Sequence, residues 1–344
     1  MQLLKTVPLL LLLIILYPVV SRAQDIHFSQ FYETALLRNP ALAGIFSGDY
    51  RIQGVYRNQW SSIAMPYQTG ALSGEAKFPI GRKDDYLTGG LQLTYDVAGA
   101  SHFQTTQALP VINYHKSLSA QRNMYLSIGF MGGFTQRQFN PAHLTFDNQY
   151  NNGAFDPTVP SGEHFEKYKY VYPDVAAGIS FSSTFGQNIN WFAGLAYYHF
   201  NYPKLTFMDN ETIELSPKWE YNAGLSAPLN DYSKLIIEYN QLKQGRYSEV
   251  MAGALLGYAI RVPQGATPYM DMIYGGVFVR WDDAIIPVVK LELEQYEFGF
   301  SYDINVSKLA KASRGFGGFE LSVAYKGFFN RPNSSLHALR CPKF

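Results

Sequence analysis

Cysteine is almost absent from this chain. The 344 residues include a single one, Cys341, so no disulfide can form within the chain. Charged residues are also scarce, because Asp, Glu, Lys and Arg make up 16% of the sequence, whereas soluble domains average about a quarter. The formal net charge is only +1, so the basic footprint of a nucleic-acid-binding protein is missing. Neither a disulfide-stapled fold nor a nucleic-acid partner is therefore expected.

Long hydrophobic runs are missing after residue 23. The longest, Met251–Ile260, contains two glycines and falls well short of the roughly 18 residues that a transmembrane helix needs. Catalytic signatures are missing too: there is no G-x-S-x-G, no H-E-x-x-H, no phosphate-binding glycine loop and no metal-spaced Cys/His cluster. We therefore expect no enzyme and no cofactor. A hydrolase site assembled from distant strands is the one enzymatic alternative left open.

Aromatic residues and glycine are abundant instead. The chain has 26 Tyr, 24 Phe and 29 Gly, yet its mean hydropathy is slightly negative, at −0.13. A helical membrane protein would be far more apolar. A barrel with an apolar outer face and a polar lumen combines these two properties.

The first residues predict export. Lys5 gives the N-terminus a positive charge, Val7–Val20 is strongly apolar, and Ser21-Arg22-Ala23 places small residues where a signal peptidase reads them. We predict that residues 1–23 form a signal peptide cleaved before Gln24. A retained membrane anchor is the alternative.

Alternation of apolar and polar side chains recurs along the rest of the chain. It is clearest in Leu87–Val97, Tyr296–Ile304 and Phe319–Lys326. Successive side chains of a strand point to opposite faces, so this pattern predicts strands with one apolar and one polar face. About fourteen such segments are expected, near residues 49–60, 66–78, 86–98, 102–116, 123–139, 172–184, 190–201, 217–229, 233–244, 247–262, 270–281, 284–294, 296–305 and 317–328.

The lengths of the connections favour a barrel that spans the outer membrane. The three longest, 140–171, 202–216 and 306–316, all follow odd-numbered strands. Outer-membrane barrels have long loops outside and short periplasmic turns, so this parity indicates that both termini are periplasmic. A soluble β-sandwich is the alternative, but its strands average only about five or six residues. We therefore expect an all-β, transmembrane, antiparallel outer-membrane β-barrel over residues 49–344.

Several short motifs form a series with a known resemblance. They are Phe28-Ser29-Gln30, Asn39-Pro40-Ala41-Leu42-Ala43-Gly44, Tyr56-Arg57-Asn58-Gln59-Trp60, residues 300–309, residues 317–322 and Cys341-Pro342-Lys343-Phe344. In this order, the series resembles the PorP/SprF family of the type IX secretion system of Bacteroidota. The resemblance covers nearly the whole mature chain and is weakest around residues 140–171.

The resemblance implies an outer-membrane barrel that works with type IX secretion components. Members of this family are associated with the export or surface attachment of large proteins, gliding adhesins among them, and some connect to periplasmic proteins. The motif residues are accordingly candidates for partner binding: Phe28, Ser29, Gln30, Asn39, Pro40, Gly44, Arg57, Asn58, Gln59 and Trp60.

Residues 24–48 are expected to form a segment without strands at the periplasmic mouth. Asn39 precedes a proline, which disfavours a helix there, and glycines continue the loop into the first strand. We predict that the segment folds into the lumen or contacts a periplasmic partner. A tether that covers the base of the barrel is the plainer alternative.

Charged residues near the ends of the chain are expected to line the lumen. Arg51 and Arg57 lie on the face opposite Tyr50, Ile52 and Tyr56, and charge is costly on the lipid face. We predict ion pairs where the first and last strands meet, among Arg51, Arg57, Glu292, Glu297, Asp303 and Glu320. Trp60 fits an interfacial aromatic as well as a motif residue.

Three functions follow from these patterns. The first is docking of a large surface protein by an outer-membrane component of type IX secretion, with secretion components, periplasmic proteins and membrane lipid as partners. The second is a channel for a small or apolar solute, which depends on whether residues 24–48 occlude the lumen. The third is a structural anchor that contacts periplasmic rings through the turns at 81–85, 119–123 and 263–269.

Overall fold

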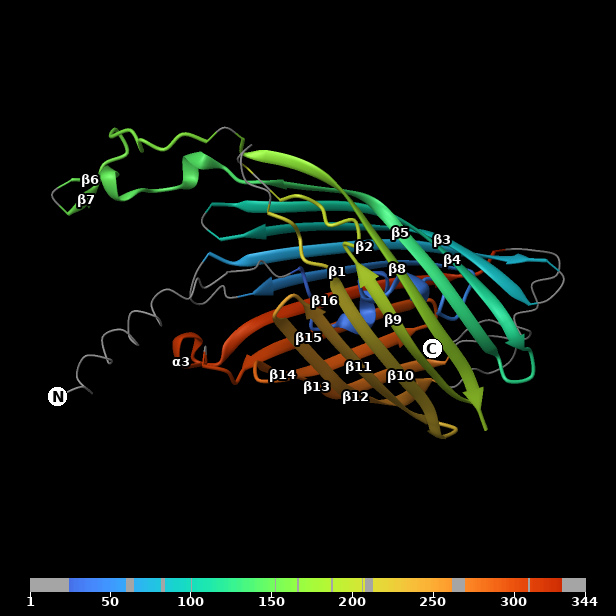
Figure 1. Cartoon of the computed structure of the whole chain (residues 1–344). Coiled ribbons are helices and arrows are strands. Elements are labelled where there is room, and N and C mark those ends of the chain that lie inside the picture. Colours follow the sequence, from blue (N-terminus) through green and yellow to red (C-terminus); the bar gives the residue numbers. More distant parts are fainter. Residues whose placement is uncertain are drawn as a thin grey trace, which may run out of the picture.

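The strands close into a single antiparallel barrel. The computed structural model describes residues 25–59, 65–81, 84–99, 101–151, 153–165, 167–186, 188–205, 207, 213–261, 270–308 and 310–329. Within them, 14 strands follow one another around the wall, and the first strand pairs with the last (Figure 1). The predicted fold class is thereby confirmed. The predicted signal peptide, residues 1–23, and Trp60 lie outside the described residues.

The barrel strands agree closely with the segments expected from alternation. Their bounds are β1 Tyr50–Gln59, β2 Tyr67–Ile80, β3 Asp85–Ala98, β4 Phe103–Ser119, β5 Met124–Gln138, β8 Lys169–Phe185, β9 Ile189–Tyr198, β10 Lys218–Asn230, β11 Ser233–Gln244, β12 Tyr247–Arg261, β13 Asp271–Arg280, β14 Ala284–Leu293, β15 Tyr296–Asn305 and β16 Phe316–Gly327. The barrel closes where Tyr50 pairs with Gly327 and Gln59 pairs with Gly318. The largest difference in length is in β8, which has 17 residues and begins three residues earlier than expected.

The remaining elements are short. A small hairpin within the loop between β5 and β8 pairs β6 (Tyr150–Asn151) with β7 (Ala154–Phe155). It was not expected, because strands of two residues carry no readable alternation. The helical turns are η1 Phe31–Glu33, α2 Ala35–Arg38, η2 Pro40–Leu42, η3 Pro141–His143, η4 Asp147–Gln149 and α3 Ala310–Ser313. Among the described residues, none of the helices is long and apolar enough to cross a bilayer.

Each strand has one face toward the outside and one toward the lumen. In β15, Phe298 and Phe300 are 44% and 47% exposed, whereas Ser301 and Asp303 are buried. The same alternation runs through the other strands, so large apolar side chains cover the outer face and polar ones point inward. This arrangement suits a wall between lipid and a polar interior.

The two ends of the barrel differ. The three longest connections, 139–168, 199–217 and 306–315, join β5 to β8, β9 to β10 and β15 to β16. Because the strands are antiparallel and consecutive, these connections share one end, on the left in Figure 1, where α3 and the β6–β7 hairpin lie. We call it the long-loop end. The opposite end, where β1 begins and β16 finishes, is the short-turn end.

Candidate functional site

The lumen contains the segment that precedes β1. Residues 25–48, here called the plug, pass through the interior as η1, α2 and η2 (blue in Figure 1). Asp25 lies at the long-loop end, where its carboxylate contacts His199 just beyond β9. At the short-turn end, the Asp49 amide that follows the plug donates to the Gly327 carbonyl at 2.7 Å. The segment thus lies in the lumen, which is one of the two arrangements predicted for it, and it runs from one end of the lumen to the other instead of staying at one mouth.

Phe28, Ser29 and Gln30 fix the first part of the plug to the closing strands. The backbone amides of Ser29 and Gln30 donate to the two carboxylate oxygens of Glu320 at 2.6 and 2.7 Å. The Gln30 side chain also donates to the Glu320 carbonyl oxygen and accepts from the Ser322 hydroxyl. Phe28 packs against β1 and β2. One buried carboxylate thus satisfies two amides that no secondary structure pairs.

Asn39 and Pro40 shape the middle of the plug and hold it against the wall. The Asn39 side-chain oxygen accepts from the Ala41 amide at 2.8 Å and so caps η2, which Pro40 begins. The Asn39 amide group donates to the Ile179 carbonyl of β8 at 3.2 Å. A Cβ at Gly129 would overlap the Pro40 carbonyl carbon. The wall therefore has a glycine at a point where the plug backbone leaves no room for a side chain.

Gly44 makes the turn by which the plug leaves η2. Its φ is +84°, a conformation that glycine adopts without strain, and a Cβ there would collide with the Thr88 hydroxyl. Its amide donates to the Glu75 carboxylate at 2.8 Å. The glycine of the motif is thus required by backbone conformation and by the closeness of β3.

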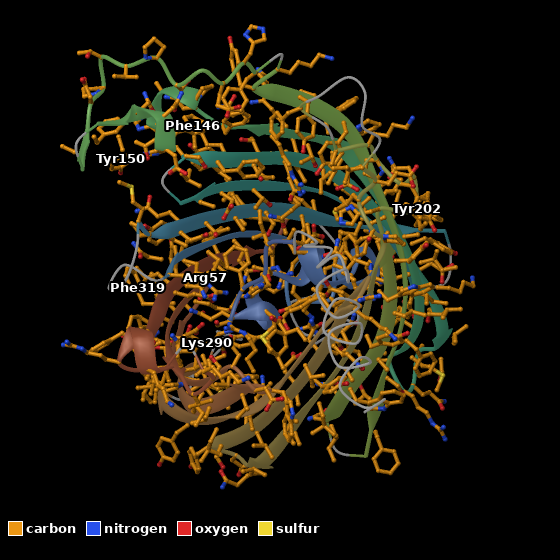
Figure 2. All side chains as sticks on the ribbon, turned by 60° about the vertical axis from the view of Figure 1, so that its left-hand side comes forward. Arg57, Phe146, Tyr150, Tyr202, Lys290 and Phe319 are labelled. Carbon is orange, nitrogen blue, oxygen red and sulfur yellow. The ribbon has the colours of Figure 1, made fainter. Side chains whose placement is uncertain are left out.

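Arg57 joins the plug to the seam between β1 and β16. Its guanidinium lies 3.2 Å from Asp303 and 3.3 Å from Glu320, and it donates to the carbonyl oxygen of His27 in the plug at 2.8 Å. Arg280 of β13 also reaches Asp303, at 3.1 Å. Figure 2 shows Arg57 inside the ring of strands. Of the predicted group, Arg57 therefore contacts both Asp303 and Glu320.

The other predicted lumenal charges pair differently. Arg51 contacts Glu75 of β2 at 2.7 Å rather than Glu320. Glu297 is paired with Lys290 at 3.1 Å and with Lys326, and Glu292 lies 3.7 Å from Lys290. Strand register explains this correction, because Arg51 is opposite Glu75 in the β1–β2 ladder, whereas Glu320 is opposite Arg57. Lys290 also holds Glu33 of the plug at 2.8 Å.

A carboxylate–imidazole chain fixes the start of the plug. His199 lies between Asp25, at 2.6 Å, and Asp174, at 2.7 Å. Burial disfavours its charged form, but the two carboxylates outweigh burial and raise the pKa of His199 to about 9. His199 and the ammonium of Lys218 hold the pKa of Asp25 far below its usual range, against the effect of burial. Sequence reasoning missed this group, since its three main members belong to no motif and are far apart in the chain.

A vestibule lies above the start of the plug at the long-loop end. The cavity has a volume of about 410 Å³, within the range of small-ligand sites. Ile26 and Leu37 of the plug form part of its lining, and Gln59, Arg137 and Lys218 line its wall. The plug therefore forms part of the surface of this cavity.

In this structure, most of the motif residues belong to the plug or hold it against the wall. Most of the set lies buried between plug and wall: Phe28, Ser29, Gln30, Asn39, Pro40, Gly44 and Arg57. Asn58 is half-buried and is near the Tyr56 hydroxyl on the outer face, and Gln59 lines the vestibule. A role of these residues in binding a partner remains a prediction.

Comparison with known proteins identifies the family to which this chain belongs. A family profile described as "Type IX secretion system membrane protein PorP/SprF" matches residues 20–325. No curated protein matches the chain. Solved structures resemble its barrel at low identity: the toluene transporter TbuX of Ralstonia pickettii (9% identity, TM-score 0.49, covering 89% of this chain and 95% of that one) and the translocator domain of the autotransporter NalP of Neisseria meningitidis (11%, 0.43, 81% and 88%). Since the profile spans most of the sequence, the chain belongs to the PorP/SprF family of type IX secretion system membrane proteins.

Proposed function

We propose that the protein is a non-enzymatic outer-membrane component of the type IX secretion system that docks a large exported surface protein, such as a gliding adhesin, at its long-loop end. Long loops of outer-membrane barrels face the exterior, so the vestibule would open to the cell surface. Secretion components and periplasmic proteins would contact the short-turn end. Docking requires an accessible, shaped surface and no chemical step.

One observation carries this proposal: the plug occupies the lumen along its length, while a cavity remains beside it at the long-loop end. The plug is held by Glu320, Asp174 through His199, Glu75 and Lys290, which belong to four separate parts of the wall. A large protein cannot thread through a lumen occupied in this way, whereas it can rest on the long-loop end. Passage of a small solute, the alternative, requires the plug to move.

The test is the surface proteome of a clean deletion strain beside its parent. We expect one or a few large proteins to vanish from the surface and other type IX exports to remain. Loss of all exports would make the protein a core part of the machine instead. An unchanged surface proteome would overturn the secretion proposal and leave the solute channel as the better one.

A matched pair of complementing chains locates the docking end. One lacks residues 144–165 of the loop between β5 and β8, and the other has residues 120–123 of the turn after β4 replaced by glycine and serine. We expect the loop deletion to leave the large protein unanchored, released into the medium, and the turn replacement to restore it to the surface. The opposite result would move docking to the short-turn end.

A further inference from the structure

The outer face of the wall carries a hollow over the seam between β1 and β16. Its volume is about 960 Å³, and it is lined by β14, β15 and β16 on one side of the seam and by β1 to β4 on the other. Large apolar side chains that point outward form its flanks, among them Phe300, Leu321 and Leu93. The hollow therefore opens toward the membrane and not toward the lumen. We call it the outer hollow.

Two glycines leave the middle of the outer hollow empty. Gly54 of β1 and Gly70 of β2 both line it. A Cβ at Gly54 would come no closer than 3.8 Å to its neighbours, and one at Gly70 would meet only the Tyr95 carbonyl oxygen, at 4.0 Å. These are ordinary contact distances, so packing within the barrel does not require glycine at either position. The missing side chains leave room for an apolar ligand that arrives from the bilayer.

Uncompensated positive charge lies beside the seam at the long-loop end. Lys308, Lys311 and Arg314 are all exposed in the loop of residues 306–315, which joins β15 to β16. None of the three is within 4 Å of a carboxylate of the residues that the structure describes. In the neighbouring turn between β13 and β14, Asp283 is already paired with Arg280 at 2.9 Å. The three cations are therefore available to an anionic ligand. We call this loop the basic loop.

Hydrogen bonds hold the basic loop against the rim of the barrel. The Asn305 side chain donates to the Ser313 hydroxyl at 3.1 Å, and the Asn305 amide donates to the Gly315 carbonyl at 3.0 Å. The Val306 amide donates to the carbonyl of Asp283 at 2.8 Å. Figure 1 shows α3, the helical turn of this loop, beside the ends of the last strands. The cations thus have a fixed place relative to the seam.

The basic loop and the outer hollow are one leaflet apart. Lys308 follows the outward-facing Val306 by two residues, and Arg314 precedes the outward-facing Phe316 by two. From Phe316 to Leu321 in the hollow, β16 runs roughly 16 Å at the usual rise per residue. Half of a hydrocarbon core about 30 Å thick is nearly the same length. A lipid with its headgroup at the basic loop therefore has acyl chains that reach the hollow.

We propose that this face of the barrel binds a phosphorylated lipid of the outer leaflet, namely lipid A, with its phosphate groups on Lys308, Lys311 and Arg314 and its acyl chains in the outer hollow. Lysine and arginine are the usual ligands of phosphate in proteins. The long loops of outer-membrane barrels face the exterior, where lipid A forms the leaflet. This inference goes beyond the docking function and shares with it only the orientation of the barrel.

Native mass spectrometry of the purified full-length protein in detergent micelles tests the choice of lipid. The probes are diphosphoryl lipid A and phosphatidylethanolamine, and the bound fraction at each concentration gives the affinity. We expect lipid A to bind at least about tenfold more tightly, because each cation near an anionic lipid surface strengthens binding roughly fivefold. Equal affinity for the two lipids, or no binding of lipid A, would overturn the site.

A triple variant tests the basic loop. Lys308→Gln, Lys311→Gln and Arg314→Gln together should weaken lipid A binding by about tenfold or more and leave that of phosphatidylethanolamine unchanged. The matched control removes three other exposed cations at the long-loop end, with Lys204→Gln, Lys243→Gln and Arg246→Gln. It should bind lipid A like the wild type. If both triple variants lose the same affinity, only net charge matters and the basic loop is not the phosphate site.

Filling the outer hollow tests where the acyl chains lie. Gly54→Leu with Gly70→Leu should weaken lipid A binding, since the new side chains occupy the space of the chains. Gly89→Leu with Gly275→Leu is the control, because both glycines face open space outside the hollow. Wild-type affinity in the filled variant would refute the hollow as the acyl-chain site. These measurements are independent of the surface proteome, so failure of the lipid site and failure of the docking function can be told apart.

Discussion

At the scale of single residues, some glycines on the lumen face of the wall leave room for the plug, whereas a glycine on the lipid face can lie in open space. Gly129 faces the backbone of Pro40 and Ala41, whereas a Cβ at Gly89 in β3 would meet nothing within 4 Å. The same residue type in the same kind of strand thus has two different roles. The side of the strand decides which one applies.

Gly129→Ala should displace the middle of the plug. The new methyl group overlaps backbone that cannot turn away, and overpacking of this kind costs about 1–3 kcal/mol. We expect faster proteolysis of residues 39–44 in the folded barrel, measured by limited digestion and mass spectrometry. Gly89→Ala is the control and should digest like the wild type. Equal protection in both variants would contradict the close packing of plug and wall.

His199 should make plug stability depend on pH. Its pKa is about 9 in the fold against an ordinary 6.5, so its contribution is complete below about pH 6.5 and is lost as the pH rises through about 9. The linked free energy is roughly 3 kcal/mol at most. We expect the difference in urea midpoint between the wild type and His199→Gln to shrink between pH 6.5 and 9.5. A difference that stays constant over this range would show that the charge of His199 is not involved.

At the scale of elements, the start of η1 is anchored through β16. Glu320 of β16 accepts both amides at the start of η1 and also contacts Arg57. Glu292 of β14 is also lumenal, but its nearest basic partner, Lys290, is 3.7 Å away. The two glutamates therefore differ in what they hold, although both were predicted to line the lumen.

Glu320→Gln should loosen the start of the plug. The change keeps the shape of the side chain but removes one acceptor oxygen and its charge, and hydrogen bonds to charged groups are worth about 1.5–3 kcal/mol. We expect faster amide hydrogen exchange in residues 28–31 and little change in the barrel strands. Glu292→Gln serves as the control and should leave exchange in these residues unaltered. Similar exchange in both variants would contradict the anchoring role.

The sequence allowed the elements to be predicted far better than the site. Alternation identified the wall because each strand repeats the same two-residue period over ten residues or more. The plug follows no such period, and its partners lie up to 292 positions away. The contact of Arg51 with Glu75 and that of Asp25 with His199 depend on strand register and on the path of the plug. Neither property can be read from local pattern.

At the scale of the whole molecule, the apolar outer face of the strands is the surface that contacts lipid when the barrel is inserted in a membrane. Phe300 of β15 lies on it in the middle of its strand, while Phe155 of β7 is 41% exposed in the loop. Both are exposed phenylalanines, but only the first faces lipid in a membrane-inserted barrel. The pair therefore separates the effect of lipid from that of exposure.

Phe300→Arg should reduce the free energy of unfolding of the inserted barrel by about 2–4 kcal/mol, the cost of an arginine near the bilayer midplane. Urea titration in lipid vesicles measures it. Phe155→Arg should change the same quantity by less than about 0.5 kcal/mol, as is usual for surface positions. Equal effects of the two substitutions would mean that β15 does not face lipid.

The Glu320 anchor links the two ends of the polypeptide. Ser29 is made before all the barrel strands, and its acceptor is made 291 positions later, in β16. A chain cut short before β16 lacks both the strand that closes the sheet and the carboxylate that receives the plug. Its lumen then contains a segment with unmet amides beside an open edge. An unfinished copy therefore differs from a finished one in its interior, because it lacks the carboxylate that a finished copy buries against the plug.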